Sequence, residues 1–274
     1  MAETISSAAN PLVKRIRLLA NRKHRREQGA FVVEGIQPVW RAVTAGWEIE
    51  ALVADPDLRP DSAAAAMVAE QEARGVRVAR ASHELFQRLS SREGQAGLVA
   101  VVRSRQRALA DLSPGPDSVF VALHRIGNPG NLGTIIRTAD AVGGAGVILI
   151  GDTTDPYAPI AVKASMGSLF AIKVVHVPAP ESFLTWAGEN GVEVLAASGQ
   201  ADVAHWDASY RPPLAVLLGS EGEGLPAELL ASADGRIRIP MTGTAESLNV
   251  AAAAAVLLYE VRRHKLGADV RRQP

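Results

Sequence analysis

Apolar side chains along residues 10–28 recur at intervals of three and four positions. This spacing places Leu12, Val13, Ile16, Leu19 and Ala20 on one face of a helix, which is typical of an amphipathic helix. The other positions are strongly basic and carry Lys14, Arg15, Arg17, Arg22, Lys23, Arg25 and Arg26. The pattern therefore predicts one basic helix with a buried apolar side.

Short apolar runs alternate with helical patterns through the next part of the chain. Strands are predicted at residues 31–33, 52–54, 76–78 and 97–102, and helices around residues 39–42, over 61–74 and after Ser82. Such alternation is typical of a small α/β domain. Residues 104–117 are polar and contain Pro114-Gly115-Pro116, so we expect a linker there and a first domain at residues 1–103.

The second part of the chain, residues 118–274, has longer apolar runs without polar alternation. These runs lie at residues 119–123, 147–150, 172–177, 192–197 and 214–218. Uninterrupted apolar runs fit strands that are buried on both faces of a parallel sheet. A last helix is predicted from about Ser247 to His264. We therefore expect a second α/β domain with a parallel sheet.

Composition agrees with two folded domains. The chain has 274 residues, of which 47% are hydrophobic, and it has no cysteine. Disulfides and thiolate metal ligands are thereby excluded. No stretch of about 18 apolar residues occurs, which argues against a membrane span. The N-terminal residues have no apolar leader segment, and we expect a cytoplasmic protein.

Charge is distributed unevenly although the formal net charge is zero. Residues 1–30 carry a net charge of +5 and residues 261–274 a net charge of +4, whereas residues 31–260 carry −9. Two basic ends on an acidic body suggest contact with a polyanion such as RNA. For the C-terminal end, a solvated tail without a partner is an equally good interpretation.

Three polar or glycine-rich segments follow predicted strands, where open α/β sheets bind their ligands. The first covers residues 128–140, in which Asn131 and Arg137 lie on a helix that begins after glycines and asparagines. The free N–H groups of that helix start could face a polar ligand. A simple capped helix with Arg137 in a surface ion pair is the alternative.

The second segment, residues 217–226, has three glycines within six residues after a buried strand. Glycines permit close approach of the backbone to a ligand. Their spacing fits neither a dinucleotide fingerprint nor a P-loop, and Glu221 would repel a phosphate. A ligand that is neutral or cationic suits this loop better. A plain glycine-rich turn before a helix is the alternative.

The third segment covers residues 239–251 and leads into the last helix. Ser247 is predicted to be the N-cap of this helix, and Asn249 is expected in its first turn.

Together and in this order, the three segments resemble motifs 1, 2 and 3 of the SpoU (TrmH) family of RNA ribose 2′-O-methyltransferases, within the SPOUT superfamily. Residues 162–168 also resemble a family segment that lies between motifs 1 and 2. Asn10-Pro11, Lys14 and residues 31–35 are similar to the family's accessory RNA-binding domain, which has a ribosomal-protein-L30-like fold.

The resemblance implies a trefoil-knotted C-terminal α/β domain with a parallel sheet, a homodimer, and S-adenosylmethionine as cofactor. By position, it implies that the cofactor contacts Leu218, Gly219, Glu221, Gly224, Ile239, Met241 and Leu248. It implies a catalytic and substrate-orienting set of Asn131, Arg137, Glu221, Ser247 and Asn249. Because arginine stays protonated in proteins, we assign Arg137 a hydrogen-bonding and electrostatic role rather than that of a base.

The expected substrate is RNA, with 23S ribosomal RNA first and transfer RNA second, and the modification could be housekeeping or protective against an antibiotic. The expected RNA-contacting residues are Lys14, Arg17, Arg22, Lys23, Arg25 and Arg26. None of the six histidines has metal-ligand spacing to another, so we expect no metal. A non-catalytic RNA-binding or ribosome-binding protein of the same fold is the main alternative. A nicotinamide-dependent enzyme is disfavoured because the glycines at 143–146 precede a strand rather than follow one.

Overall fold

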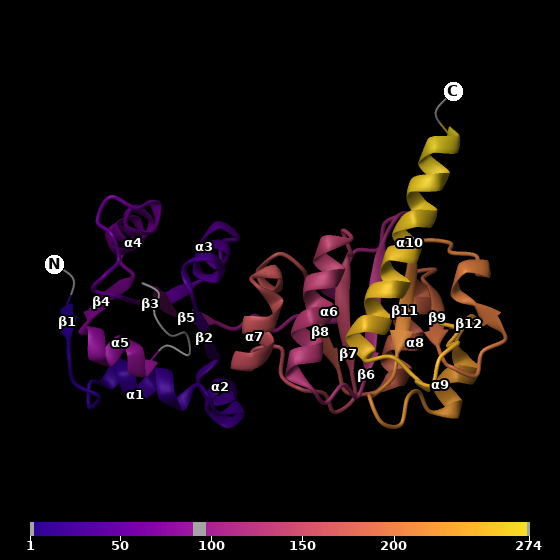
Figure 1. Cartoon of the computed structure of the whole chain (residues 1–274), viewed down its shortest axis with the longest axis horizontal. Coiled ribbons are helices and arrows are strands. Elements are labelled where there is room, and N and C mark those ends of the chain that lie inside the picture. The colour runs from indigo at the N-terminus through magenta and orange to yellow at the C-terminus, as the bar shows by residue number, and fades with distance from the viewer. Residues whose placement is uncertain (1–2, 90–96, 273–274) are drawn as a thin grey trace. The chain divides into compact units, whose positions relative to one another are not determined.

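The computed structural model describes residues 3–89 and 97–272, with side chains at residues 4–89 and 97–265. The chain divides into two compact units (Figure 1). The first comprises residues 1–105 and 157–171, and the second comprises residues 106–156 and 172–274. Within the described residues, no helix has both the length and the apolarity required to cross a membrane. The side chains of Arg271 and Arg272 in the basic tail lie outside the described part.

The first unit is built on a mixed sheet of five strands in the order β1-β4-β3-β5-β2. Strand β5 pairs antiparallel with β2 and β3, whereas β4 pairs parallel with β1 and β3. The strands are β1 (Glu3–Ile5), β2 (Ala30–Glu34), β3 (Ile49–Ala54), β4 (Arg77–Ala81) and β5 (Leu98–Arg103). The helices are α1 (Pro11–Leu18), α2 (Arg22–Gln28), α3 (Ile36–Thr44), α4 (Ala63–Ala73) and α5 (His83–Leu89). The prediction of a small α/β unit therefore agrees with these elements.

The prediction of a single basic helix over residues 10–28 was wrong, because this stretch forms two helices. Helix α1 ends at Leu18, and α2 begins after Asn21, whose Oδ1 accepts a hydrogen bond from Lys23 N at 2.9 Å. An asparagine in this position satisfies a helix-start N–H group and so favours a new helix over continuation. Leu12, Val13 and Ile16 of α1 pack into the core of the first unit as predicted.

Residues 157–171 pack with the first unit, although we predicted that they belong to the second domain. They form α7 (Pro159–Ser165) and the 3₁₀ turn η2 (Ser168–Phe170), and α7 contacts β2. The indole Nε1 of Trp47 donates a hydrogen bond to the carbonyl oxygen of Phe170 at 3.2 Å. Phe31 packs against Tyr157 with 4.6 Å between ring centroids. This aromatic cluster explains the grouping, since burial of large rings outweighs proximity in sequence.

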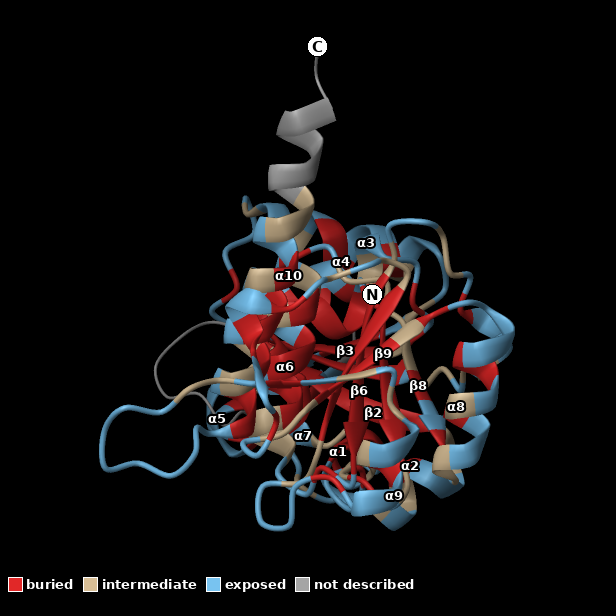
Figure 2. Ribbon diagram, turned by 90° about the vertical axis from the view of Figure 1, so that its right-hand side faces the viewer, coloured by how far each residue is buried: buried red, intermediate tan, exposed pale blue. Residues whose placement is uncertain are grey.

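The second unit is built on a seven-stranded sheet in the order β10-β12-β9-β11-β6-β7-β8. All of its strand pairs are parallel. The strands are β6 (Val119–His124), β7 (Gly146–Ile150), β8 (Val174–Val177), β9 (Glu193–Ala197), β10 (Val203–Ala204), β11 (Leu214–Leu218) and β12 (Gly235–Arg238). The predicted buried parallel sheet is confirmed, and Figure 2 shows β6 and β9 as buried ribbons.

The α-helices of this unit are α6 (Pro129–Ala141), α8 (Pro180–Glu189), α9 (Ala227–Ser232) and α10 (Val250–Arg272), and the 3₁₀ turns are η1 (Leu109–Asp111) and η3 (His205–Asp207). Helices α6, α8 and α10 contact strands of this second sheet. Phe183 and Trp186 of α8 pack against Phe120 and Ile148 of the sheet in one hydrophobic core. Helix α10 packs on α6 and contacts β11. Because β6 and β11 pair in parallel, their carboxyl ends lie at the same edge of the sheet.

Candidate active site

Helix α6 begins at the carboxyl end of β6 with a well-formed cap. Asn128 is the N-cap, and its Oδ1 accepts hydrogen bonds from the backbone N–H groups of Gly130 at 2.8 Å and Asn131 at 3.1 Å. Pro129 occupies the first helical position, where its missing N–H costs nothing. The sequence of this turn therefore fixes the helix start and, with it, the position of the Asn131 side chain.

The loop after β11 folds back tightly on itself. The backbone N–H of Ser220 donates to Gly224 O at 3.2 Å, and the N–H of Gly224 donates to Ser220 O at 3.1 Å. A Cβ atom on Gly219 would lie 2.1 Å from the carbonyl carbon of Gly224, a distance that no side chain tolerates. Glycine at position 219 is thus required by the close approach of the two backbone segments. The turn presents Glu221 at its tip.

Three side chains from the three motif segments form a continuous hydrogen-bonded chain. Asn131 Nδ2 donates to Glu221 Oε1 at 2.8 Å, and Asn249 Nδ2 donates to Asn131 Oδ1 at 3.1 Å. Asn249 Oδ1 in turn accepts from the N–H of Ala251 at 2.9 Å at the start of α10. Each amide thereby has a fixed orientation. These three hydrogen-bonded side chains link the loop after β11 to the starts of α6 and α10.

The Glu221 carboxylate is stabilised in its charged form. Burial raises the pKa of Glu221, but hydrogen bonds from Asn131 and from nearby backbone N–H groups outweigh burial and hold that pKa below its ordinary value. Two of these backbone donors are Gly127 and Asn128, both 3.4 Å from the carboxylate oxygens. A carboxylate of this kind is a poor proton acceptor at neutral pH and a good electrostatic anchor.

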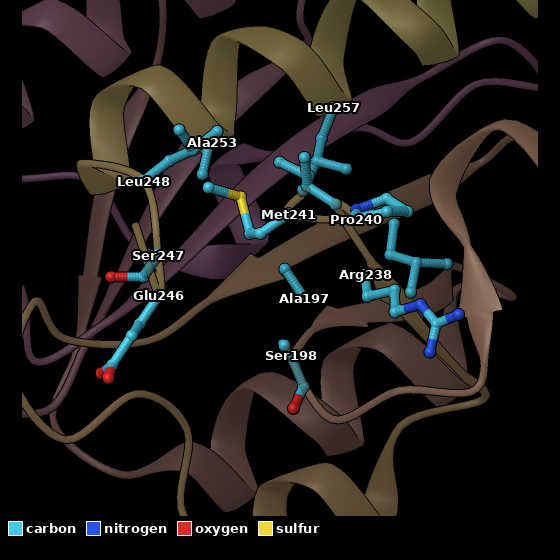
Figure 3. Close-up of a pocket in the computed structure, with 13 residues that line it drawn as sticks. Ala197, Ser198, Arg238, Pro240, Met241, Glu246, Ser247, Leu248, Ala253 and Leu257 are labelled. Carbon is cyan, nitrogen blue, oxygen red and sulfur yellow. The ribbon is translucent and has the colours of Figure 1, made fainter. Parts of the chain in front are cut away.

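A cavity of about 450 Å³ is lined by Ser247 and Leu248, which immediately precede Asn249 in the sequence (Figure 3). Its walls come from the end of β9, from β12 and the segment after it, and from the start of α10. The apolar lining includes Ala197, Ile239, Met241, Leu248, Ala253 and Leu257. The polar lining includes Ser198, Arg238, Glu246 and Ser247, with Glu246 and Arg238 on different sides of the space in Figure 3. The volume lies within the range typical of small-molecule sites.

This lining fits S-adenosylmethionine. An adenine ring needs an apolar slot, which the aliphatic side chains supply, and a zwitterionic amino-acid tail needs groups of both charges, which Glu246 and Arg238 supply. Neither a phosphate-binding glycine loop nor a cluster of cations lines the space. The cavity therefore suits a ligand with a net positive or neutral charge.

A sequence model described as the SpoU rRNA methylase family matches residues 118–259, more than half of the chain. The chain belongs to this family. A second model, described as an MRM3-like substrate binding domain, matches residues 10–100. The family predicted from the three motifs is thereby confirmed, and the two matched regions lie on either side of the expected linker.

Named relatives of this SpoU-family protein are similar over nearly their whole length. A 23S rRNA (uridine(2479)-2′-O)-methyltransferase from Streptomyces viridochromogenes is 33% identical, over 91% of this chain and 88% of the relative. A 23S rRNA (guanosine(2553)-2′-O)-methyltransferase from Bacillus subtilis is 31% identical, over 94% of this chain and 98% of the relative. The crystal structure of an AdoMet-bound rRNA methyltransferase from Sinorhizobium meliloti superposes with a TM-score of 0.88 at 39% identity, covering 96% of this chain and 98% of that one.

The structure distributes the predicted cofactor residues of this SpoU-family protein between two places. Ile239, Met241 and Leu248 line the cavity. Leu218, Gly219 and Gly224 are not among its lining residues, because Leu218 is 3% exposed at the end of β11 and the two glycines shape the neighbouring loop. Glu221 belongs to the hydrogen-bonded chain with Asn131.

Two of the predicted catalytic residues, Ser247 and Arg137, are not part of the hydrogen-bonded chain of Glu221, Asn131 and Asn249. Ser247 lines the cavity but is not the N-cap of α10; this prediction was wrong, since α10 begins at Val250 and Asn249 makes the capping hydrogen bond. Arg137 is exposed on α6, about 120° around the helix from Asn131. Within the described residues, the side chain of Arg137 makes no hydrogen bond or ion pair.

Several residues around the site were missed in the sequence. Ser198 and Gly199 follow β9 and line the cavity, as do Arg238 and Glu246. Arg125 follows β6 in a left-handed conformation, with φ of 54°, and pairs with Glu223 of the neighbouring loop at 3.6 Å. The rule that ligands lie at the carboxyl ends of parallel strands would have pointed to Ser198 and Gly199. No pattern in the sequence indicated the pair of Arg125 and Glu223.

The predicted RNA-contacting cations of the first unit have different surroundings. Lys14, Arg17, Lys23 and Arg26 are exposed, and Arg22 is half-buried. Arg25 is 6% exposed and donates from Nη1 to the carbonyl oxygens of Leu19 at 3.0 Å and Ala20 at 2.8 Å. This burial argues against an RNA contact by Arg25, because its guanidinium is bound to carbonyl groups of the turn that follows α1.

One group of side chains in the first unit has metal-ligand chemistry. Asp55, Asp57 and His83 place one possible ligand atom each within 4.8 Å of one another, and His83 Nδ1 lies 3.0 Å from Asp57 Oδ2. Asp57 and His83 are exposed, and the contact between the His83 ring and the Asp57 carboxylate accounts for their proximity. The expectation that the protein binds no metal stays a prediction.

Proposed function

We propose that this protein transfers the methyl group of S-adenosylmethionine to a ribose 2′-hydroxyl of 23S ribosomal RNA. The observation that carries the proposal is the hydrogen-bonded chain of Glu221, Asn131 and Asn249, next to a cavity that suits the cofactor. The relatives named above and the family of the chain support the same activity and the same substrate. S-adenosylmethionine is the cofactor, as the structures of bound relatives also support.

When bound, S-adenosylmethionine supplies an electrophilic methyl group on a sulfonium. Ile239, Met241 and Leu248 hold the apolar part of the cofactor in the cavity, while Ser247 and Glu246 offer polar groups at its mouth. The ionised Glu221 keeps the loop after β11 bound to the start of α6. These contacts hold the site in a fixed geometry before RNA binds. Such positioning of the reactants is the main contribution that a protein makes to an in-line methyl transfer.

Arg137 serves the attacking hydroxyl through charge. Its exposed guanidinium can hold a phosphate beside the target ribose or stabilise the oxygen as it loses its proton. Proton removal by Arg137 is disfavoured because a guanidinium remains protonated. Glu221 is equally unsuited to removing the proton, since its pKa is held below the ordinary value. The two residues act as anchors of opposite charge.

The first unit binds RNA through exposed cations on its first two helices. Lys14 and Arg17 on α1, together with Lys23 and Arg26 on α2, offer positive charge to phosphates. The match of residues 10–100 to a substrate binding domain supports this role. A ribosomal-protein-L30-like fold for this unit belongs to the same proposal.

The second unit forms a trefoil knot and pairs with a second copy in this proposal. Support for the knot comes from the path of the chain, which leaves β12 beside β9 and returns as α10 to pack on α6 and β11. Support for a homodimer comes from Val256 and Tyr259 of α10, large side chains that are 37% and 57% exposed. Apolar side chains exposed along a helix favour an interface between proteins.

Transfer of tritium from labelled S-adenosylmethionine tests the proposed activity. We expect label in 23S rRNA and none in transfer RNA when the full-length protein is incubated with each. Reverse transcription at low nucleotide concentration then locates the modified residue. Label in transfer RNA alone would contradict the proposed substrate, and no label in any RNA would favour a non-catalytic binding protein.

A further inference from the structure

The first unit contains a second cavity, of about 410 Å³, bordered by α1, β2, α5 and α7. Residues 162–168, the segment between motifs 1 and 2, do not line the candidate cofactor cavity. Val162 and Lys163 from this segment line the second cavity. The segment thus contributes to a site in the unit that carries the RNA-contacting helices.

The inner wall of this cavity is apolar. Ile16, Val32, Leu89 and Val162 line it, and each is at most 9% exposed. At the mouth lies Ile160, which is 61% exposed and has the highest exposure of the large apolar side chains in the described part of the chain. The exposed apolar surface of this isoleucine is in contact with water, and a flat ligand could cover it.

Three cations from three separate elements surround the same space. They are Arg17 of α1, Arg88 of α5 and Lys163 of α7, against one carboxylate, Glu34 of β2. Within the described residues, the side chain of Arg17 makes no hydrogen bond or ion pair. Arg88 pairs with Glu84 at 2.6 Å, and both of these side chains are more than half exposed, so water or a phosphate can replace that contact at little cost. The rim of the cavity therefore favours an anion.

We propose that this cavity binds one unstacked nucleotide of the RNA substrate, with its base against the apolar wall and its phosphates at Arg17, Arg88 and Lys163. The inference rests on the proposed function, since it assumes that the protein binds RNA. An apolar slot edged by positive charge matches a nucleotide, whose base is flat and whose phosphates are anionic. Duplex RNA cannot enter such a site because its bases are stacked and paired. The first unit would accordingly select single-stranded or looped RNA.

Binding of short RNAs to the full-length protein tests this proposal. The probes are a fluorescent oligouridylate and an RNA duplex of the same length. We expect Ile160→Asn to weaken binding of oligouridylate by about tenfold, the scale for the loss of one aliphatic side chain that binding removes from water, and to leave duplex binding within about twofold. Leu18→Asn is the matched control, since Leu18 is an exposed apolar residue of α1 that does not line the cavity.

Photocrosslinking gives a second readout that needs no variant. Oligouridylate with 4-thiouridine should crosslink to peptides that contain Ile160, Val162 or Ile16, and excess unlabelled oligouridylate should compete. Equal effects of Ile160→Asn and Leu18→Asn, or crosslinks confined to other peptides, would overturn the proposed cavity. Methyl transfer by the wild-type protein is scored separately, so a failure of the methyltransferase proposal remains distinguishable from a failure of this one.

Discussion

Asn131 donates a hydrogen bond to Glu221 at 2.8 Å across 90 residues of sequence, and this contact joins the first and second motif segments. Asn249 completes the connection to the third segment at 3.1 Å. The amide of Asn131 is thus the central member of the chain, because it donates to one neighbour and accepts from the other.

Replacing Asn131 with aspartate should disrupt the site more than it disrupts the fold. A second carboxylate would face Glu221, and like charges in contact repel and raise the pKa of one partner. We expect methyl transfer to fall by about 100-fold, which is the scale for loss of one fixed polar group in an active site. Thr138→Ala, further along α6, is the control for helix stability. Similar turnover by the two variants, measured with saturating RNA, would show that the contact with Glu221 is dispensable.

The pH dependence of stability should report on Glu221. Because its folded-state pKa lies below its ordinary value, ionised Glu221 stabilises the folded protein above the ordinary glutamate pKa, and this contribution is lost as pH falls through the lower folded value. Urea unfolding followed from neutral to acidic pH should therefore show a steeper decline for the wild type than for Glu221→Gln. Parallel curves for the two proteins would mean that Glu221 has no preferential interaction in the folded state.

Gly219 and Gly222 lie three positions apart in the same loop and make a matched pair. A Cβ at Gly219 would overlap the backbone of Gly224, whereas a Cβ at Gly222 meets nothing within 4 Å. Gly219→Ala should lower the free energy of unfolding by about 1–3 kcal/mol, the scale for overpacking, and weaken cofactor binding measured by calorimetry. Gly222→Ala should resemble the wild type in both measurements. Equal effects at the two positions would refute the assigned role of the Gly219 backbone contact.

Cations on α2 should separate into an RNA-binding group and a structural one. Each exposed cation that contacts a phosphate reduces the salt dependence of RNA binding by about one unit of slope when it is removed. Lys23→Ala combined with Arg26→Ala should therefore weaken binding and flatten the salt dependence. Arg25→Ala should instead lower the free energy of unfolding by about 1–3 kcal/mol, since two carbonyl groups lose their donor. A salt slope that changes for Arg25→Ala alone would reverse this assignment.

The substitution Arg137→Lys tests whether geometry or charge alone matters. Lysine keeps the positive charge but cannot make two parallel hydrogen bonds to a phosphate. We expect turnover to fall by at least about tenfold with little change in RNA affinity. Nearly full turnover of the lysine variant would mean that a point charge is sufficient.

Much of the fold could be predicted because its signals are local. The strands β6, β7 and β11 are uninterrupted apolar runs, and burial on both faces makes them so. Strand β12 was missed because only one of its four residues, Ile237, has an apolar side chain, and it alone is buried. The break between α1 and α2 was also missed. It depends on a single N-cap residue, Asn21, and the spacing of apolar residues hardly changes across it.

The site was predictable in its residue types but less so in its contacts. Asn131, Glu221 and Asn249 were chosen through motif resemblance, and the structure adds that they touch in this order. The burial of Arg25 and the packing of residues 157–171 on the first unit depend on contacts between distant parts of the chain. Spacing along a sequence carries no information on such contacts.

Analysis of nucleosides by mass spectrometry tests the central claim most directly. The full-length protein is incubated with 23S rRNA and S-adenosylmethionine, and the RNA is digested to nucleosides and fragmented at the glycosidic bond. We predict that the added methyl group remains with the ribose fragment and that Asn131→Asp abolishes most of the signal. A methyl group on the base fragment, or no methylated nucleoside at all, would contradict the account.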